Sequence, residues 1–175
     1  TGYGAVYYLQ EVLKHENDTI EGKRLAISGY GNVAWGIMKK SAELGAKVTY
    51  FSGPDGYVHD PDGVNTDEKL NFILEMRAKD PMHCKPYADK FGCEFVAGQK
   101  AWGAKDVDVN MPSAMQNDVR VGEAEKIAAE GHPNVYVHIY GKSESRPRRK
   151  MGHITYVGMT LEEFERDWSG RFARD

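Results

Sequence analysis

The chain has 175 residues, of which 41% are hydrophobic and 28% are charged, and this balance predicts a folded globular protein. Its formal net charge of −3 argues against broad binding to nucleic acid or to anionic membranes. No apolar run approaches the roughly 20 residues of a membrane-spanning helix, and no signal peptide is visible, so we expect a cytoplasmic protein.

Helical and strand patterns alternate along residues 1–130. The helices place apolar residues three and four positions apart, whereas the strands are short apolar runs bounded by turn residues. The expected elements are, in chain order, a helix at 3–16, a strand at 23–28, a helix at 32–44, a strand at 46–51, a loop or hairpin at 53–63, a helix opened by a capping box at 65–68, a short helix at 86–91, strands at 93–96 and 107–111, and a helix at 119–130. This alternation predicts an α/β fold, with a Rossmann-like parallel sheet and helices on both faces.

The C-terminal part differs from the rest in composition. Residues 135–157 predict a β-hairpin with a long basic loop, and a closing helix begins near Thr160. Residues 135–175 carry more basic than acidic side chains, whereas residues 1–134 carry more acidic than basic ones. We therefore divide the chain into a main domain at 1–134 and an appended hairpin and helix at 135–175, packed on the same domain.

Metal and disulfide sites are not expected. The two cysteines, Cys84 and Cys93, form no Cys-x-x-Cys pair, and no two of the six histidines have convincing ligand spacing. Three aspartates between residues 55 and 62 lack the full pattern of a calcium-binding loop, so their expected role is in turns.

A glycine-rich turn connects the strand at 23–28 to the helix at 32–44. Residues 29–34 fit the pattern G-x-G-x-x-A, in which the first glycine permits the tight turn and the second lets the backbone approach a pyrophosphate. The free N–H groups at the helix start would then bind the phosphates. A purely structural turn is the alternative. The residues of the predicted dinucleotide site are Gly29, Tyr30, Gly31, Asn32 and Val33.

The segment after the second strand is the candidate contact for a ribose. Dinucleotide sites usually place an Asp or Glu about 20 residues after the glycines. Here Ser52 could supply a weaker hydrogen bond, and Asp55 lies slightly late. No Arg or Lys stands at this position to bind a 2′-phosphate, so the sequence favours NAD over NADP.

Several blocks resemble the cofactor-binding domain of hexameric glutamate dehydrogenases, over about residues 1–128. They are the run at 1–36, AELGAKVTYFSGPDGYV, KLNFILEMRA, YADKFG and VDVNMPSAMQNDV. The resemblance implies a domain that binds NAD or NADH, with residues 29–33 at the pyrophosphate. It also implies that Ser52, Pro54 and Asp55 line the adenosine ribose and that Ser113 and Ala114 lie towards the nicotinamide.

The same resemblance bears on activity. In that family a separate preceding domain supplies the catalytic residues, so we assign no catalytic residue here. We expect this chain to bind the cofactor without dehydrogenase turnover. The sequence predicts no oligomeric state.

A second resemblance covers about residues 135–158. The run VHIYGKSESRPRRKMGHITYVG is similar to the C-terminal part of N5-carboxyaminoimidazole ribonucleotide synthase, which implies that Lys142 and Arg149 bind a phosphate. A solvated basic loop is the alternative. Two families meeting near residue 130 suggest an engineered or recombined chain, whose strand at 135–140 would join the main sheet. Two further hypotheses are therefore a structural chimera with no ligand function and a ribotide- or phosphate-binding remnant.

Overall fold

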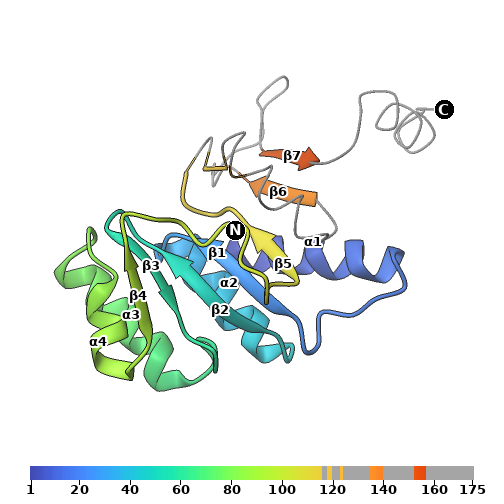
Figure 1. Ribbon diagram of the computed structural model, residues 1–175. Helices are drawn as coiled ribbons and strands as arrows, with labels where there is room; N and C mark the ends of the chain where they lie inside the picture. The colour runs from blue at the N-terminus through green and yellow to red at the C-terminus, as the bar shows by residue number, and fades with distance from the viewer. Residues whose placement is uncertain (116–117, 120–122, 124–134, 140–151, 157–175) are drawn as a thin grey trace.

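A five-stranded sheet with the order β4-β3-β2-β1-β5 forms the centre of the computed structural model (Figure 1). The structure describes residues 1–115, 118–119, 123, 135–139 and 152–156. The strands of the sheet are β1 (Arg24–Ser28), β2 (Lys47–Ser52), β3 (Gly56–His59), β4 (Glu94–Ala97) and β5 (Val109–Met111). β1 pairs in parallel with β2 on one side and with β5 on the other. The carboxyl ends of these three strands therefore lie at the same edge of the sheet.

The outer part of the sheet is antiparallel, which corrects the expectation of a parallel sheet throughout. β3 pairs antiparallel with both β2 and β4. The chain reverses directly after β2, where the Gly53 N–H donates a hydrogen bond to the Gly56 carbonyl at 2.8 Å. A turn this short leaves no room for the crossover that a parallel neighbour needs. The Rossmann-like α/β fold class is confirmed, with a mixed sheet.

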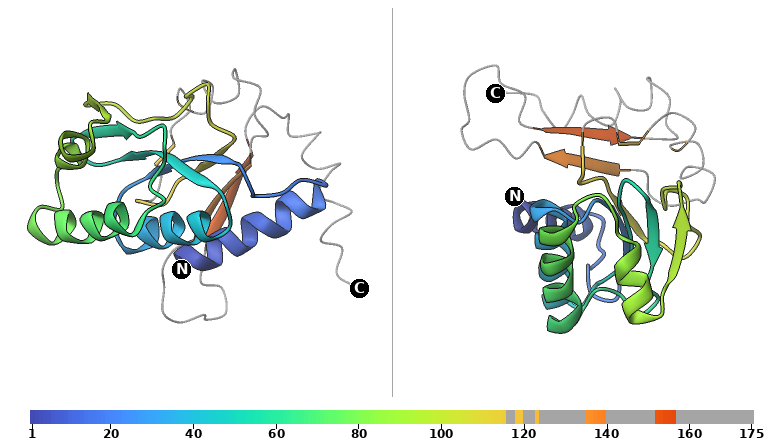
Figure 2. Two further views of the ribbon diagram at one scale, coloured as in Figure 1. Left: turned by 90° about the horizontal axis from the view of Figure 1, so that it is seen from below. Right: turned by 90° about the vertical axis from the view of Figure 1, so that its left-hand side faces the viewer.

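All four helices named here pack against one face of the sheet (Figure 2). They are α1 (Gly2–His15), α2 (Asn32–Glu43), α3 (Asp67–Lys79) and α4 (Lys85–Phe91). Leu25 and Ile27 of β1 face these helices, whereas Ala26 belongs to a smaller apolar cluster on the opposite face. In that second cluster, Ala26 packs with Trp102 and Val107 of the β4–β5 connection, so a loop covers this face among the described residues. The helix expected at 119–130 falls largely outside them.

α1 lies very close to the beginning of α2. A Cβ atom added to Gly2 would come within 2.3 Å of the Val33 carbonyl oxygen and 2.9 Å of the Gly36 Cα. The missing side chain at Gly2 therefore lets the two helices touch through their backbones. This contact supports the first turn of α2, where the glycine-rich turn ends.

The C-terminal hairpin forms a sheet of its own. β6 (Val135–Ile139) pairs antiparallel with β7 (Gly152–Tyr156) and lies near β5 without pairing with it (Figure 1). The expected hairpin is present, but the expectation that its first strand would join the main sheet is wrong. Among the described residues, no helix is long and apolar enough to cross a membrane.

Candidate functional site

Three loops meet at the carboxyl edge of the sheet. Ser28 at the end of β1 is level with Ser52 at the end of β2, and Ile27 is level with Met111 of β5. Because β1 has a parallel neighbour on each side, the connection after β1 leads to β2 while β5 lies on the opposite side of β1, which makes this edge a topological switch point. Open α/β sheets bind ligands in the crevice at such a switch point. The segments that leave the strands at this edge are residues 29–31, 53–55 and 112–115.

The two glycines of the β1–α2 turn have different structural roles. Gly29 has a φ of +76°, which favours glycine, and a Cβ atom there would lie 3.1 Å from the Ala114 Cβ. Gly31 has a φ of −71°, which any residue adopts, and a Cβ atom there would meet no atom within 4 Å. Gly31 is exposed, and the open space lies directly over its backbone. The glycine-rich turn predicted from the sequence is present, whereas its role at a pyrophosphate stays a prediction.

The start of α2 presents unused hydrogen-bond donors. The first backbone bond inside the helix runs from the Trp35 N–H to the Gly31 carbonyl, at 2.8 Å. The N–H groups of residues 32–34 precede it and have no acceptor within the helix. In the described part of the chain, no side chain caps this end, and the first turn holds no acidic residue. An anion placed above Gly31 would satisfy these donors and the positive end of the helix dipole.

The other predicted residues of this turn point in different directions. Tyr30 is buried, packs edge-on against Phe51, and donates its hydroxyl to the Asp80 carbonyl at 3.3 Å. Burial raises the pKa of Tyr30, so the phenol stays neutral. Its side chain belongs to the core, and only its backbone faces the turn. Asn32 is exposed and Val33 is half-buried.

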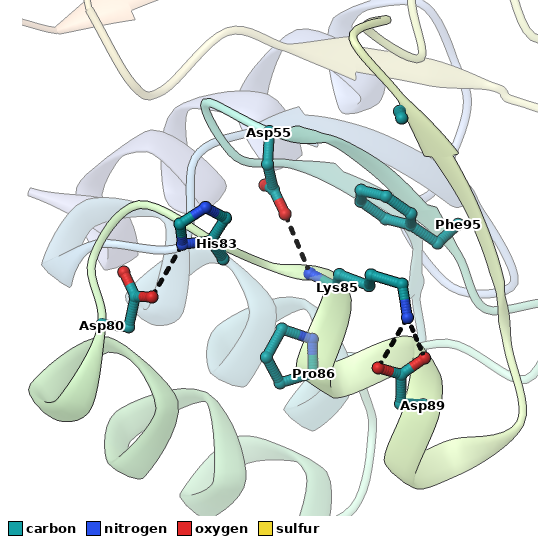
Figure 3. Close-up of a pocket in the computed structure, with 8 residues that line it drawn as sticks. Asp55, Asp80, His83, Lys85, Pro86, Asp89 and Phe95 are labelled. Atoms are coloured by element: carbon teal, nitrogen blue, oxygen red, sulfur yellow. Dashed lines mark hydrogen bonds and ion pairs between the residues drawn. The ribbon is translucent and has the colours of Figure 1, made fainter.

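Asp55 is hydrogen-bonded within the protein. Its carboxylate accepts the Cys84 N–H at 3.0 Å and the Lys85 N–H at 3.2 Å, so it caps the start of α4 (Figure 3). Partial burial opposes ionisation, but hydrogen bonds from Cys84 and Lys85 outweigh it, and the pKa of Asp55 is lowered. Ser52 is buried and Pro54 is exposed. The loop predicted to contact a ribose is therefore fixed by a contact with a segment 29 residues away in sequence.

A pocket of about 440 Å³ lies beside this loop and was not predicted from the sequence. Its lining includes Asp55, Asp80, His83, Lys85, Asp89 and Phe95 (Figure 3). His83 pairs with Asp80 at 2.7 Å, which raises the pKa of His83, and Lys85 pairs with Asp89 at 2.6 Å. Two basic side chains thus line the same pocket as Asp55. The sequence did not predict this pocket, because its lining residues lie far apart along the chain.

The third loop is tied to the end of β1. The Ser113 and Ala114 N–H groups donate to the Ser28 Oγ at 2.8 and 3.1 Å, and the Ser113 hydroxyl donates to the Ser28 carbonyl at 2.7 Å. Ala114 packs against Gly29. The structure therefore brings Ser113 and Ala114 to the glycine turn.

Lys142 and Arg149, the candidate phosphate ligands, lie outside the described residues. Within the described ranges, no group of three or more His, Cys, Asp or Glu side chains could hold a metal ion, and Cys84 and Cys93 are free thiols.

Comparisons with known proteins agree with this geometry. The chain is 58% identical over 129 residues to the NAD-specific glutamate dehydrogenase of Clostridium symbiosum, covering 74% of this chain and 28% of that protein. It is 37% identical over 131 residues to the NADP-specific glutamate dehydrogenase of Haemophilus influenzae, covering 75% of this chain and 29% of that protein. A solved glutamate dehydrogenase structure superposes with a TM-score of 0.74 at 56% identity, covering 78% of this chain and 30% of the other. The chain thus spans less than a third of the length of these relatives.

Two family models match the sequence. The model of the phosphoribosylaminoimidazole carboxylase C-terminal domain matches residues 112–167, most of which lie outside the described residues, and this short match does not show a chimera. The model of glutamate/leucine/phenylalanine/valine dehydrogenases matches residues 1–135, which include the whole five-stranded sheet and the glycine-rich turn. On this match, the chain belongs to the glutamate/leucine/phenylalanine/valine dehydrogenase family.

Proposed function

We propose that residues 1–115 bind a nicotinamide dinucleotide, with its pyrophosphate on the N-terminus of α2. The observation that carries this proposal is the open space over the exposed Gly31, next to N–H groups that no described side chain caps. A pyrophosphate supplies the negative charge and the acceptors that such a helix start lacks. Membership of a dehydrogenase family supports the same ligand.

The topology suggests how the two halves of the ligand lie. In Rossmann-like sites the adenosine ribose is bound at the end of the second strand. We therefore expect the adenosine half over Ser52, Pro54 and Asp55, and the nicotinamide half towards Ser113 and Ala114 across the switch point. When bound, the nicotinamide ring exchanges a hydride with a substrate. By analogy with the relatives, that substrate would be glutamate, and the role of this segment would be to hold and orient the cofactor.

We further propose a preference for NAD over NADP. The pocket beside the ribose position contains three carboxylates, and His83 and Lys85 are each paired with one of them. The third, Asp55, accepts hydrogen bonds from backbone N–H groups and a thiol, and it forms no ion pair with a basic side chain among the described residues. A 2′-phosphate would add negative charge beside this carboxylate, which is unfavourable. Because His83 and Lys85 are already paired with carboxylates, neither is free to bind a 2′-phosphate, and this supports a preference for NAD.

Titration with NADH, followed by its fluorescence, tests the proposal. The wild-type chain is expected to bind NADH with a Kd at or below roughly 100 μM, and NADPH more weakly. Gly31→Val should weaken NADH binding at least about tenfold, because its methyl groups occupy the space reserved for the pyrophosphate. Gly4→Val is the matched control, because a Cβ atom at Gly4 also meets nothing within 4 Å but belongs to α1 and not to the glycine-rich turn.

The outcomes separate two errors. If the folded wild-type chain shows no saturable binding of NADH, the proposed function is wrong. If the wild-type and Gly31→Val proteins bind NADH equally well, the chain binds the dinucleotide, but the pyrophosphate does not lie at α2.

A further inference from the structure

Ser28 links the end of β1 to the loop that follows β5. It is buried, and its hydroxyl accepts the Ser113 N–H at 2.8 Å and the Ala114 N–H at 3.1 Å. The same hydroxyl donates to the carboxylate of Asp118. A serine hydroxyl has one donor and two acceptor positions, so every hydrogen-bonding position of Ser28 Oγ is used within the protein.

Asp118 is fixed from its other side by Lys100. Asp118 is 2% exposed, and its carboxylate pairs with the Lys100 ammonium, which also donates to the Asp118 carbonyl at 2.8 Å. Trp102 donates its indole N–H to the same carbonyl at 3.3 Å. A buried carboxylate is stable only when it is paired and hydrogen-bonded, so the Lys100 pair keeps Asp118 in place against Ser28.

The result is a loop held in one position over the glycine-rich turn. Two N–H groups of the loop point at Ser28, and Ala114 packs on Gly29, where an added Cβ atom would lie 3.1 Å from the Ala114 Cβ. The residues that hold the loop come from three distant parts of the chain, at positions 28, 100 and 118. The loop after β5 is therefore held beside the glycine-rich turn by these hydrogen bonds and not by apolar packing alone.

We propose that Ser28, held by Asp118 and Lys100, is a positioning residue that sets where the nicotinamide half of the dinucleotide binds. The inference rests on the proposed function, which places the pyrophosphate at α2 and the nicotinamide half on the β5 side. Ser28 acts through residues 113 and 114 and has no hydrogen-bonding capacity left for the ligand. The adenosine half, on the β2 side, is independent of Ser28.

Comparing two ligands on one variant tests this inference. NADH contains both halves of the dinucleotide, whereas ADP-ribose contains the adenosine half and the pyrophosphate but no nicotinamide. In Ser28→Ala the loop loses two hydrogen bonds, and the Kd for NADH should rise about tenfold. The Kd for ADP-ribose, measured by calorimetry, should stay within about twofold of the wild-type value.

A matched control separates positioning from a general loss of stability. Ser41→Ala makes the same truncation at a fully buried serine of α2, whose hydroxyl has no hydrogen-bond partner among the described residues. It should leave both dissociation constants unchanged. If Ser28→Ala does not fold, Asp118→Asn provides a second test, because it keeps the shape of the side chain while weakening the hold of Lys100. It should weaken NADH binding more than ADP-ribose binding.

Each outcome has a defined meaning. Selective weakening of NADH supports the inference. Equal weakening of both ligands, or a lower melting temperature with both constants unchanged, overturns it and leaves the proposed function standing. If the folded wild-type chain binds neither ligand, both the inference and the proposed function are overturned.

Discussion

The buried ion pair between Asp60 and Lys69 gives the sharpest test of the fold. Asp60 follows β3 and is 1% exposed, and its Oδ2 lies 2.6 Å from the Lys69 Nζ and 2.7 Å from the Tyr87 hydroxyl, which donates to it. Lys69→Met would leave the carboxylate buried without a cation. Breaking a buried pair by removing one partner costs about 3–5 kcal/mol. This loss is a large part of the 5–15 kcal/mol by which a domain is typically stable.

Two further variants separate burial from simple charge pairing. Asp60→Asn combined with Lys69→Met removes both charges, so the double variant should recover most of the stability that the single variant loses. Asp89→Ala breaks another Lys–Asp pair of the same 2.6 Å length, in which Lys85 is 54% and Asp89 60% exposed. That exposed pair should contribute no more than about 0.5 kcal/mol.

Urea unfolding of the four proteins measures these differences. The midpoint concentration should fall strongly for Lys69→Met and hardly at all for Asp89→Ala, with unchanged slopes. If Lys69→Met and Asp89→Ala cost the same, burial does not control the strength of these pairs and the reasoning is refuted. The same conclusion follows if the double variant is less stable than Lys69→Met.

Two other predictions concern the contact between α1 and α2 and the stability of the protein at low pH. Gly2→Ala should destabilise the fold by about 1–3 kcal/mol, because its methyl group would meet the Val33 carbonyl. Gly4→Ala, where a Cβ atom meets nothing, should be neutral or stabilising. Calorimetry measures the melting temperatures of both variants. Because its pKa lies below the unfolded value of 3.8, Asp55 should contribute stability above that pH and lose it as the pH falls through its lower folded value. Asp55→Asn should therefore flatten the melting temperature profile between about pH 5 and 3, and an unchanged profile would contradict this role.

Local chemistry explains which parts could be predicted from the sequence. The β1 strand, its glycine-rich turn and α2 follow one another directly, so their signals lie within adjacent residues. The start of α3 was misplaced by one residue, because Thr66 accepts the Lys69 N–H while Asn65 donates to the Asp62 carbonyl instead. Both residues are good caps, and only the backbone conformation decides between them. The apolar strand at 94–97 was close to its predicted place, but an apolar run does not carry strand direction.

Contacts between distant segments could not be predicted in the same way. Asp55 was assigned to a ribose from its place after the second strand, yet its hydrogen bonds go to Cys84 and Lys85. Ser28 carried no signal as a functional residue, because Asp118 lies 90 residues further along the chain. Ser28 meets its partners at the carboxyl edge of the sheet, where the ends of β1, β2 and β5 come together. The partners of Asp55 stand instead at the start of α4, which only the folded chain brings next to this loop.

The two loops beside the glycine-rich turn are therefore fixed by the same physical means. On the β2 side, the Asp55 carboxylate accepts N–H groups at the start of α4; on the β5 side, the Asp118 carboxylate connects Lys100 to Ser28. Each carboxylate joins its loop to a segment far away in sequence. Ordering a loop during binding costs free energy, and this cost is small here because these contacts already order both loops in the free protein. Between these two anchored loops, no side chain of the described residues caps the start of α2, so a diphosphate bound there would supply the missing acceptors without rearranging the fold.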